Sequence, residues 1–237
     1  MSAADLHVVA HPSGLALTTT SITKAYGEHI ALEPLDLTVA ARTRVALVGH
    51  NGSGKTTMMK LAAGVLDATA GTIEVFGHTA GSTDARRLLS WLGDTPTFYD
   101  DISLWEHMEY VARLHGVEEW EPRAARLVDL VGLGERRDQI PTTFSRGMRQ
   151  KAAIALAFVR PFALLLVDEP FVGLDNAGRV ALLALLDEVA AAGATTIVAT
   201  HELGFVDRVD RVLALRDGAL VHDGDPHAID IAVLVDP

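Results

Sequence analysis

The sequence predicts an α/β fold with an antiparallel β subdomain and a helical subdomain inserted into the core. Three observations favour this class. Short apolar strands alternate with helices both early and late in the chain. Strand-like segments joined by polar turns precede the first helix, which predicts the β subdomain. Between residues 85 and 160 strand-like alternation disappears, and apolar residues follow helical spacing instead.

The composition excludes several classes of site and partner. The 237 residues, 49% of them hydrophobic and 22% charged, can bury a sizeable core. The chain has no cysteine, which excludes disulfides, thiolate metal sites and cysteine nucleophiles. The net charge of −11 opposes binding to a nucleic-acid backbone or to anionic lipid, so no nucleic-acid partner is expected.

The two ends are expected to lie outside the main domain, which should span residues 15–228. Residues 1–14 are interpreted as a leader and residues 229–237 as a tail. The start has no basic residue followed by an apolar run, so a secretory signal is not expected. Apolar runs such as 152–159 are much shorter than the ~20 residues that span a bilayer. We therefore expect a soluble chain, or one that attaches to a membrane through another protein.

The first third of the chain is expected to be mostly strand. Strands are predicted at 15–19, around 30–32, and at 35–39, 44–48 and 72–76. One helix should cover 57–63 and end at Gly64, because glycine readily takes the left-handed conformation just past a helix end.

The middle of the chain is expected to form the helical subdomain, over about residues 90–160. One helix is indicated by apolar residues at helical spacing, namely Trp105, Met108, Val111, Ala112 and Leu114. A second helix is predicted over 121–131, with Pro122 in its first turn and Gly132 at its end.

Strand and helix alternate again in the last third. The fully apolar run 163–167 is typical of a central parallel strand. A helix over 178–192 and a strand over 195–199 should follow. The segments 212–216 and 219–222 are predicted to form a hairpin, because Asp217-Gly218 between them is a tight-turn signal.

A glycine-rich loop between a strand and a helix predicts a nucleoside triphosphate site. Residues 49–56 match the pattern G-x-x-x-x-G-K-[ST], whose backbone N–H groups surround phosphate oxygens at a helix N-terminus. Lys55 would reach the β- and γ-phosphates, and the Thr56 hydroxyl would hold Mg²⁺. The predicted contacts are Gly49, His50, Asn51, Gly52, Ser53, Gly54, Lys55, Thr56 and Thr57. The position of His50 assigns no role to its side chain.

Two carboxylates and a histidine extend this site. Asp168 and Glu169 follow the strand at 163–167, so they should lie at the carboxyl edge of the sheet, where open α/β proteins bind ligands. Asp168 could hold Mg²⁺ through water, and Glu169 could orient or deprotonate an attacking water. His201 follows the next strand and could contact the γ-phosphate. Together with the glycine loop, these residues predict a P-loop NTPase core of the RecA-like kind.

The segment Phe144 to Lys151 resembles the signature sequence of ABC ATPases, usually Leu-Ser-Gly-Gly-Gln. The chain keeps Ser145 and Gly147 and has Arg146 in place of the first glycine. The resemblance covers nearly the whole chain, about residues 15 to 225. It implies that Ser145 and Gly147 bind the γ-phosphate of ATP held by a second subunit.

The same resemblance assigns further positions. It implies that Tyr26 stacks on adenine, that residues 171–175 couple two nucleotide sites across a dimer, and that His201 is the switch histidine. At the position where the family usually has a glutamine that contacts Mg²⁺, this chain has Asp94. Asp94 could still ligate Mg²⁺, but it cannot donate a hydrogen bond as an amide does.

The resemblance implies an ATP-hydrolysing subunit of a bacterial ABC transporter, with an exporter favoured. Its implied cofactors are ATP and Mg²⁺, and its implied partners are a separate transmembrane permease and a second ATPase subunit, in a homodimer or a heterodimer. It would lie on the cytoplasmic face of the cell membrane. The alternatives are a soluble, non-transport ABC ATPase and a P-loop kinase or GTPase. The last two leave Ser145 to Gln150 unexplained.

Aromatic residues near Asp94 leave two interpretations open. Trp91, Trp105, Phe98 and Tyr99 could form the groove for a membrane partner, or they could simply pack between helices.

Overall fold

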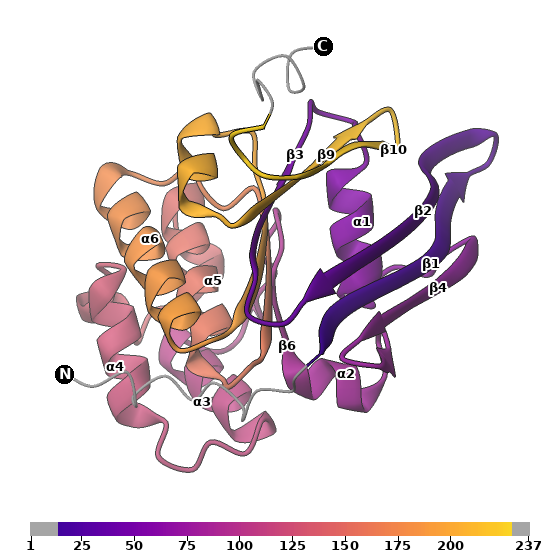
Figure 1. The fold of residues 1–237 in the computed structure, drawn as a ribbon. Helices are drawn as coiled ribbons and strands as arrows, with labels where there is room; N and C mark the ends of the chain where they lie inside the picture. The colour runs from indigo at the N-terminus through magenta and orange to yellow at the C-terminus, as the bar shows by residue number, and fades with distance from the viewer. Residues whose placement is uncertain (1–13, 229–237) are drawn as a thin grey trace.

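Two β-sheets and the helices around them make up residues 14–228, the part of the chain that the computed structural model describes (Figure 1). Except for Gly14, the predicted leader and the predicted tail lie outside the described residues. The two sheets with helices around them confirm the predicted α/β fold class. The domain bounds remain predictions.

The smaller sheet is antiparallel and has the strand order β2-β1-β4-β5. Its strands are β1 (Leu15–Tyr26), β2 (His29–Ala40), β4 (Ala70–Val75) and β5 (His78–Thr79). The first two strands are longer than predicted because their register shifts between Thr19 and Ile22, which interrupts the alternation of side chains. At that shift Ser21 has a φ of 45°, and its N–H donates to Asp36 Oδ1 at 2.6 Å.

The larger sheet has the order β10-β9-β3-β8-β7-β6, and all pairs except β9–β10 are parallel. Its strands are β3 (Arg44–Val48), β6 (Leu89–Leu92), β7 (Leu164–Asp168), β8 (Thr195–Ala199), β9 (Arg211–Arg216) and β10 (Ala219–Gly224). The predicted hairpin is confirmed, since Asp217 and Gly218 both have the positive φ that its turn requires.

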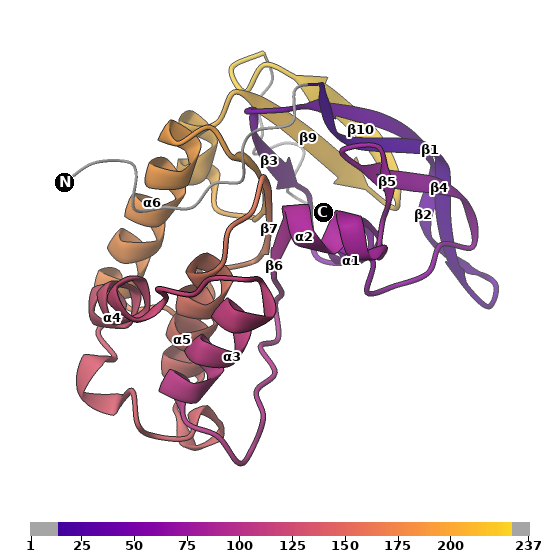
Figure 2. The ribbon, with the colours of Figure 1, turned by 90° about the horizontal axis from the view of Figure 1, so that it is seen from below.

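Helices cover both faces of the larger sheet (Figure 2). α1 (Lys55–Ala62) and α2 (Thr83–Leu88) lie between the two sheets, whereas α6 (Asn176–Ala191) and the helical subdomain cover the other face. That subdomain contains α3 (Leu104–Leu114), α4 (Glu121–Leu130) and α5 (Arg146–Val159). Short 3-10 helices are η2 (Gly134–Arg136), η3 (Pro141–Thr143) and η4 (Leu203–Arg208). None of the helices within residues 14–228 is long and apolar enough to cross a membrane.

Alternate residues of the central strands serve two separate hydrophobic cores. Leu164 and Leu166 of β7 pack with α1 and the smaller sheet, whereas Leu165 and Val167 pack with α5 and α6. This sharing explains why the strand is apolar throughout and why it ends with polar residues only at the carboxyl edge.

The expectation that residues 85–160 contain no strand is wrong at β6. These four residues pair in parallel with β7, and the Ser90 hydroxyl donates to the Ala157 carbonyl at 2.7 Å. A strand this short shows no periodicity of its own, and its pairing depends on residues far away in the chain. The helical subdomain therefore follows an edge strand of the core sheet.

Candidate functional site

The predicted phosphate loop connects β3 to α1, and two of its glycines are required by close backbone contacts. A Cβ on Gly49 would lie 2.2 Å from the Leu215 carbonyl oxygen, and one on Gly54 would lie 2.8 Å from that of Ala31. Gly52 has a φ of 87° and open space around it. The loop is thus held against β9 of the larger sheet at one end and against β2 of the smaller sheet at the other, and its middle is open to a ligand.

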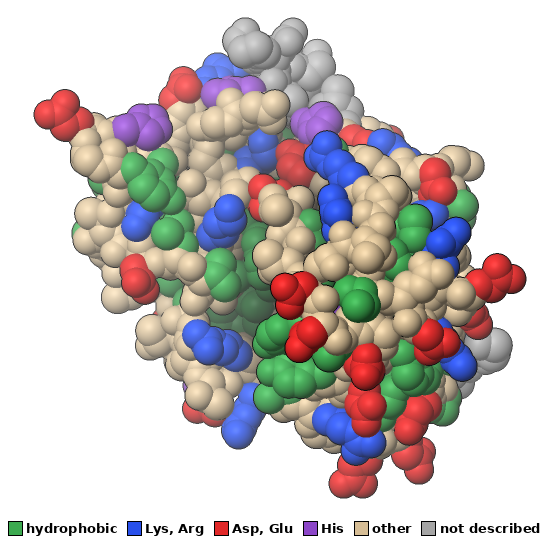
Figure 3. Space-filling view, turned by 180° about the vertical axis from the view of Figure 1, so that it is seen from behind, with side chains coloured by type: hydrophobic (Ala, Val, Ile, Leu, Met, Phe, Trp, Pro, Cys, Tyr) green, Lys and Arg blue, Asp and Glu red, His purple; other side chains and the backbone are tan. Residues whose placement is uncertain are grey.

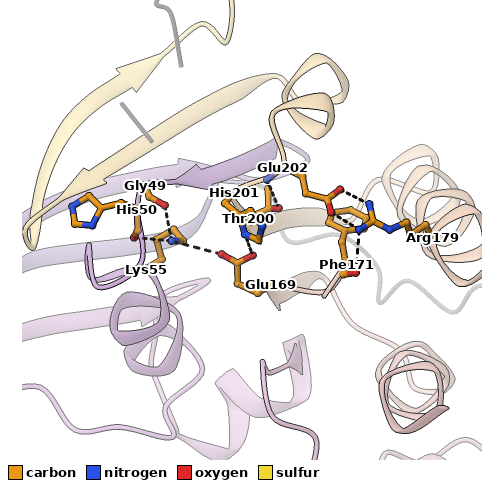
Figure 4. A network of polar contacts seen from close by, with 9 residues as sticks. All are labelled: Gly49, His50, Lys55, Glu169, Phe171, Arg179, Thr200, His201 and Glu202. Carbon is orange, nitrogen blue, oxygen red and sulfur yellow. Dashed lines mark hydrogen bonds and ion pairs between the residues drawn. The ribbon is translucent and has the colours of Figure 1, made fainter. Parts of the chain in front are cut away.

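The Lys55 ammonium lies buried inside this loop (Figure 4). It donates to the Gly49 carbonyl at 2.7 Å and to the His50 carbonyl at 3.1 Å. It also lies 3.6 Å from Glu169 Oε1. The loop and the carboxyl end of β7 therefore share one cation, at the point where phosphate oxygens would compete for it.

Glu169 is held in a strained conformation immediately after β7. Its φ is 46°, a region that costs a non-glycine residue about 1 kcal/mol or more. Its N–H donates to the Ala199 carbonyl of β8 at 2.9 Å, and its Oε2 pairs with His201 Nδ1 at 2.8 Å. The neighbouring strand thus fixes the direction of the carboxylate toward Lys55 and His201.

Asp168, the last residue of β7, is fully buried, and neither carboxylate oxygen accepts a hydrogen bond. Burial raises the pKa of Asp168 to about 6, and the charges of Asp94 and Glu169 add to this rise. The Thr56 hydroxyl and the Lys55 ammonium lower this pKa again, although the Thr56 contact does not reach full hydrogen-bond geometry. Burial therefore outweighs these two contributions, and it disfavours the charged form of this carboxylate.

The residues around Asp168 fit Mg²⁺. Its two oxygens lack partners next to the Thr56 hydroxyl, and hard oxygen ligands of this kind suit the ion. Residues 14–228 contain no group of three or more His, Asp or Glu side chains that could hold a metal by themselves. Mg²⁺ commonly takes one or two carboxylates together with substrate phosphates. Asp94 is less directly placed, since its Oδ1 lies 3.9 Å from Lys60 Nζ.

A cleft of about 310 Å³ lies over the loop. It is lined by Tyr26, His29, Ala31, Asn51, Gly52, Gly54, Lys55, Thr56, Thr57 and Glu169. Tyr26 ends β1 and is 52% exposed, so its ring is available beside the loop. His29 and Ala31 were not identified in the sequence analysis, since only the pairing of β1 with β2 brings them here.

Some predicted residues lie outside this cleft lining. Gly49 and Ser53 are loop residues beneath it, and Ser53 is fully buried. The His50 ring turns toward the hairpin, with its Nε2 3.4 Å from Asp217 Oδ1. Asp94 and His201 do not line the cleft either, although His201 reaches it through Glu169.

The signature-like segment also lies outside the cleft lining. Ser145 is the N-cap of α5, and its Oγ accepts a hydrogen bond from the Met148 N–H at 3.3 Å. A Cβ on Gly147 would lie 2.7 Å from the Gly173 carbonyl oxygen, so only glycine fits there. Within one chain, the structure does not bring Ser145 and Gly147 to the phosphate loop.

The aromatic residues near Asp94 divide between the two interpretations. Trp91 and Phe98 line a groove of about 460 Å³. Trp105 instead packs on Trp120 inside the helical subdomain, with ring centroids 4.9 Å apart. Tyr99 is half exposed and lies edge-on to Tyr110.

Comparison with known proteins gives matches over most of the chain. The family described as "ABC transporter" matches residues 32–172. The chain is 32% identical over 207 residues to the ABC-type transporter ATP-binding protein EcsA of Bacillus subtilis (strain 168), covering 85% of this chain and 84% of that one. It is 33% identical to the daunorubicin/doxorubicin resistance ATP-binding protein DrrA of Streptomyces peucetius, covering 88% and 65%.

An import protein and a solved structure are similar as well. The phosphonates import ATP-binding protein PhnC of Anaeromyxobacter dehalogenans (strain 2CP-C) is 35% identical, with 92% of this chain and 47% of that one covered. A solved structure described as an ATP binding subunit of an ABC transporter superposes with a TM-score of 0.85 and 30% identity. That match covers 92% of this chain and 97% of the other.

Proposed function

The chain belongs to the ABC transporter family as an ATP-binding subunit with ATPase activity, and we propose that it powers export through a separate transmembrane permease. The observation that carries the hydrolytic part of the proposal is the contact of Lys55 and His201 with one carboxylate, that of Glu169. In the proposal, Lys55 binds phosphate, Glu169 activates water and His201 contacts the γ-phosphate, and the two contacts support it because they keep these side chains together.

In the proposed complex, ATP lies in the 310 Å³ cleft with its adenine on Tyr26 and its phosphates on the loop. The phosphates compete with Glu169 for the Lys55 ammonium, which lies 3.6 Å from the carboxylate. Because a triphosphate carries several negative charges, it wins this competition. Glu169 is then free to orient and deprotonate the attacking water.

Asp168 and Thr56 would hold Mg²⁺, which supplies positive charge to the β- and γ-phosphate oxygens when it is bound. Asp94 would approach the same ion from the segment after β6, and its negative charge already acts on Asp168. His201 uses Nδ1 to contact Glu169, so a contact with the γ-phosphate would use Nε2.

We further propose that two subunits share each nucleotide. Ser145 and Gly147 begin α5, a helix of 14 residues with no acidic residue in its first turn. Such a helix start favours an anion. Since these residues do not line the cleft of their own chain, the proposed anion is the γ-phosphate held by a second copy or a related subunit.

The proposed docking surface for the permease is the groove of about 460 Å³ between the core and the helical subdomain. It is lined mainly by apolar side chains, among them Val65, Trp91, Phe98, Leu114 and Leu156. Figure 3 shows hydrophobic side chains gathered in a recess of the surface on the side opposite to Figure 1. Val65 is 62% exposed and Leu114 66% exposed, so this apolar surface has area that a partner would cover.

Export is proposed because Asp94, where the family usually has glutamine, resembles one branch of bacterial exporter-type ATPases. DrrA is named for drug resistance and PhnC for import, so the names of these relatives do not assign one direction of transport. The proposed location is the cytoplasmic face of the cell membrane, bound to the permease.

Cysteine cross-linking tests the proposed permease contact. Because the chain has no cysteine, Leu114→Cys introduces a single reactive site at the groove. The matched control is Val180→Cys on α6, which is 59% exposed but outside the groove. In native membranes, Leu114→Cys should cross-link to an integral membrane polypeptide and Val180→Cys should not. Equal cross-linking at both positions would contradict the proposal. Transport by the reconstituted complex would then test its direction.

A further inference from the structure

Arg179 of α6 joins two segments that lead away from the nucleotide site (Figure 4). Its Nη1 donates to Glu202 Oε2 at 2.8 Å, and its Nη2 lies 2.7 Å from Oε1 of the same carboxylate. The same guanidinium donates to the Phe171 carbonyl at 3.4 Å and lies 5.9 Å from the centre of the Phe171 ring. A planar guanidinium holding a carboxylate with two bonds fixes both distance and direction.

The Glu202 end of this bridge is anchored to the core sheet. The Glu202 N–H donates to Thr200 Oγ1 at 3.0 Å, and the Thr200 N–H donates to the Leu47 carbonyl of β3 at 3.0 Å. Thr200 is fully buried. His201 lies between these two residues and contacts Glu169 at 2.8 Å. Arg179 therefore holds the residue next to the one that contacts the catalytic carboxylate.

The Phe171 end of the bridge begins the segment 171–175. The buried Phe171 ring packs against Phe205, 5.7 Å away between centroids, on the short helix that follows Glu202. The segment ends at Asp175, which caps α6 by accepting from the Gly178 N–H at 2.8 Å. Thus the segment 171–175 and the segment that begins at Glu202 are joined by the Arg179 guanidinium and by the packing of Phe171 on Phe205.

We propose that Arg179 is a positioning residue that links the Glu169–His201 pair to the segment 171–175. The inference rests on the proposed function, in which that segment faces a second subunit. When a γ-phosphate changes the position of His201, Glu202 moves with it, and the bidentate pair transmits the shift to the Phe171 carbonyl. ATP binding is thereby coupled to the shape of the surface that meets the second copy.

A second ion pair between α6 and the segment that follows β8 provides a matched control. Arg208 of η4 lies 3.1 Å from Asp187 of α6, and both side chains are about half exposed. This pair joins the end of η4 to α6, and neither of its two residues is among those drawn in Figure 4. Arg208→Ala therefore removes a similar charge pair without touching the proposed link.

The test measures ATP-driven dimer formation in the Glu169→Gln background by light scattering, and ADP affinity by calorimetry. Arg179→Ala should raise the ATP concentration for half-maximal dimer about tenfold, as for loss of a charge-assisted pair, with ADP affinity changed less than about twofold. Arg208→Ala should match the parent. Arg179→Lys keeps the charge but cannot hold the carboxylate with two parallel hydrogen bonds, so its ATP concentration for half-maximal dimer should lie between those of Arg179→Ala and Arg208→Ala. The double variant Arg179→Glu with Glu202→Arg, which exchanges the two charges, should restore most of the dimer formation that Arg179→Ala loses.

The outcomes separate this inference from the function on which it rests. Equal dimer formation by Arg179→Ala and Arg208→Ala, in a parent that dimerises with ATP, overturns the positioning role alone. An equal loss of ADP affinity in Arg179→Ala also overturns it, because the residue would then support the nucleotide site in general. A parent that stays monomeric in ATP overturns both the shared site and the inference. If Arg179→Ala fails to fold, Arg179→Lys gives the same comparison.

Discussion

The phosphate loop and the start of α5 differ in how many of their proposed functional contacts are formed within one chain. At the loop, Lys55, Glu169 and His201 are already joined to one another by contacts of 3.6 Å and 2.8 Å. At the start of α5, the Ser145 hydroxyl accepts a hydrogen bond from the Met148 N–H of its own helix. The difference supports the proposal that phosphate binds at the loop of one copy and that Ser145 and Gly147 bind the nucleotide of a second copy.

Glu169→Gln should have the strongest effect, because it removes the carboxylate that contacts both Lys55 and His201. An amide cannot act as a general base, so steady-state ATP hydrolysis should fall by about 10²- to 10⁴-fold. Nucleotide affinity should remain, because Lys55 and the loop are unchanged. A phosphate-release assay and calorimetry measure the two effects. Near-normal turnover would remove Glu169 from its assigned role.

Lys55→Ala should weaken ATP binding about 100-fold or more, because it removes the buried cation that contacts both the loop carbonyls and Glu169. Calorimetry with ATP checks this prediction. Lys60→Ala on the same helix is the control, since its ammonium pairs with Asp94 rather than with the loop. Unchanged affinity in Lys55→Ala would contradict the phosphate site.

Ser145→Arg tests whether the start of α5 takes part in hydrolysis. Turnover should fall about 10-fold or more because the large side chain blocks closure on a second copy, while the affinity of the monomer for ATP should stay unchanged. The measurement is the ratio of turnover to ATP affinity. If hydrolysis stays normal, the start of α5 takes no part in the reaction.

Asp168→Asn should have the weakest effect, a pH-dependent change in the free energy of unfolding. The folded-state pKa of Asp168 is raised to about 6 from 3.8, so the folded protein loses stability as pH rises from about 4 to 6. Above that window Asp168→Asn should be more stable than the unaltered chain by on the order of 2 kcal/mol, and near pH 4 the difference should vanish. Denaturant unfolding at pH 4.5 and 7.5 measures this. A constant difference at both values would contradict the assigned cause.

The glycine loop, Asp168 and Glu169 could be predicted from the sequence because the patterns that indicate them are local. A glycine loop between a strand and a helix has one well-known geometry, and Asp168 and Glu169 directly follow an apolar strand. The parallel pairing of β7 and β8 then brings Glu169 and His201 together.

Features that depend on distant partners could not be predicted. β6 is four residues long and is defined by its pairing with β7. His29 reaches the cleft only through the β1–β2 hairpin. Arg179 and Glu202 form no recognisable pattern in the sequence, because their contact depends on the packing of α6 against the end of β8. Such contacts follow from tertiary packing rather than from local propensity.

Mixing two defective variants tests the shared site most directly. Lys55→Ala has a defective loop and Ser145→Arg a defective α5 start, so each alone should hydrolyse little ATP. If each site combines the loop of one copy with the α5 start of the other, a mixed dimer contains one intact site. An equimolar mixture should then regain about a quarter of the normal turnover, given random pairing of copies. Turnover no greater than the average of the two separate variants would contradict the account.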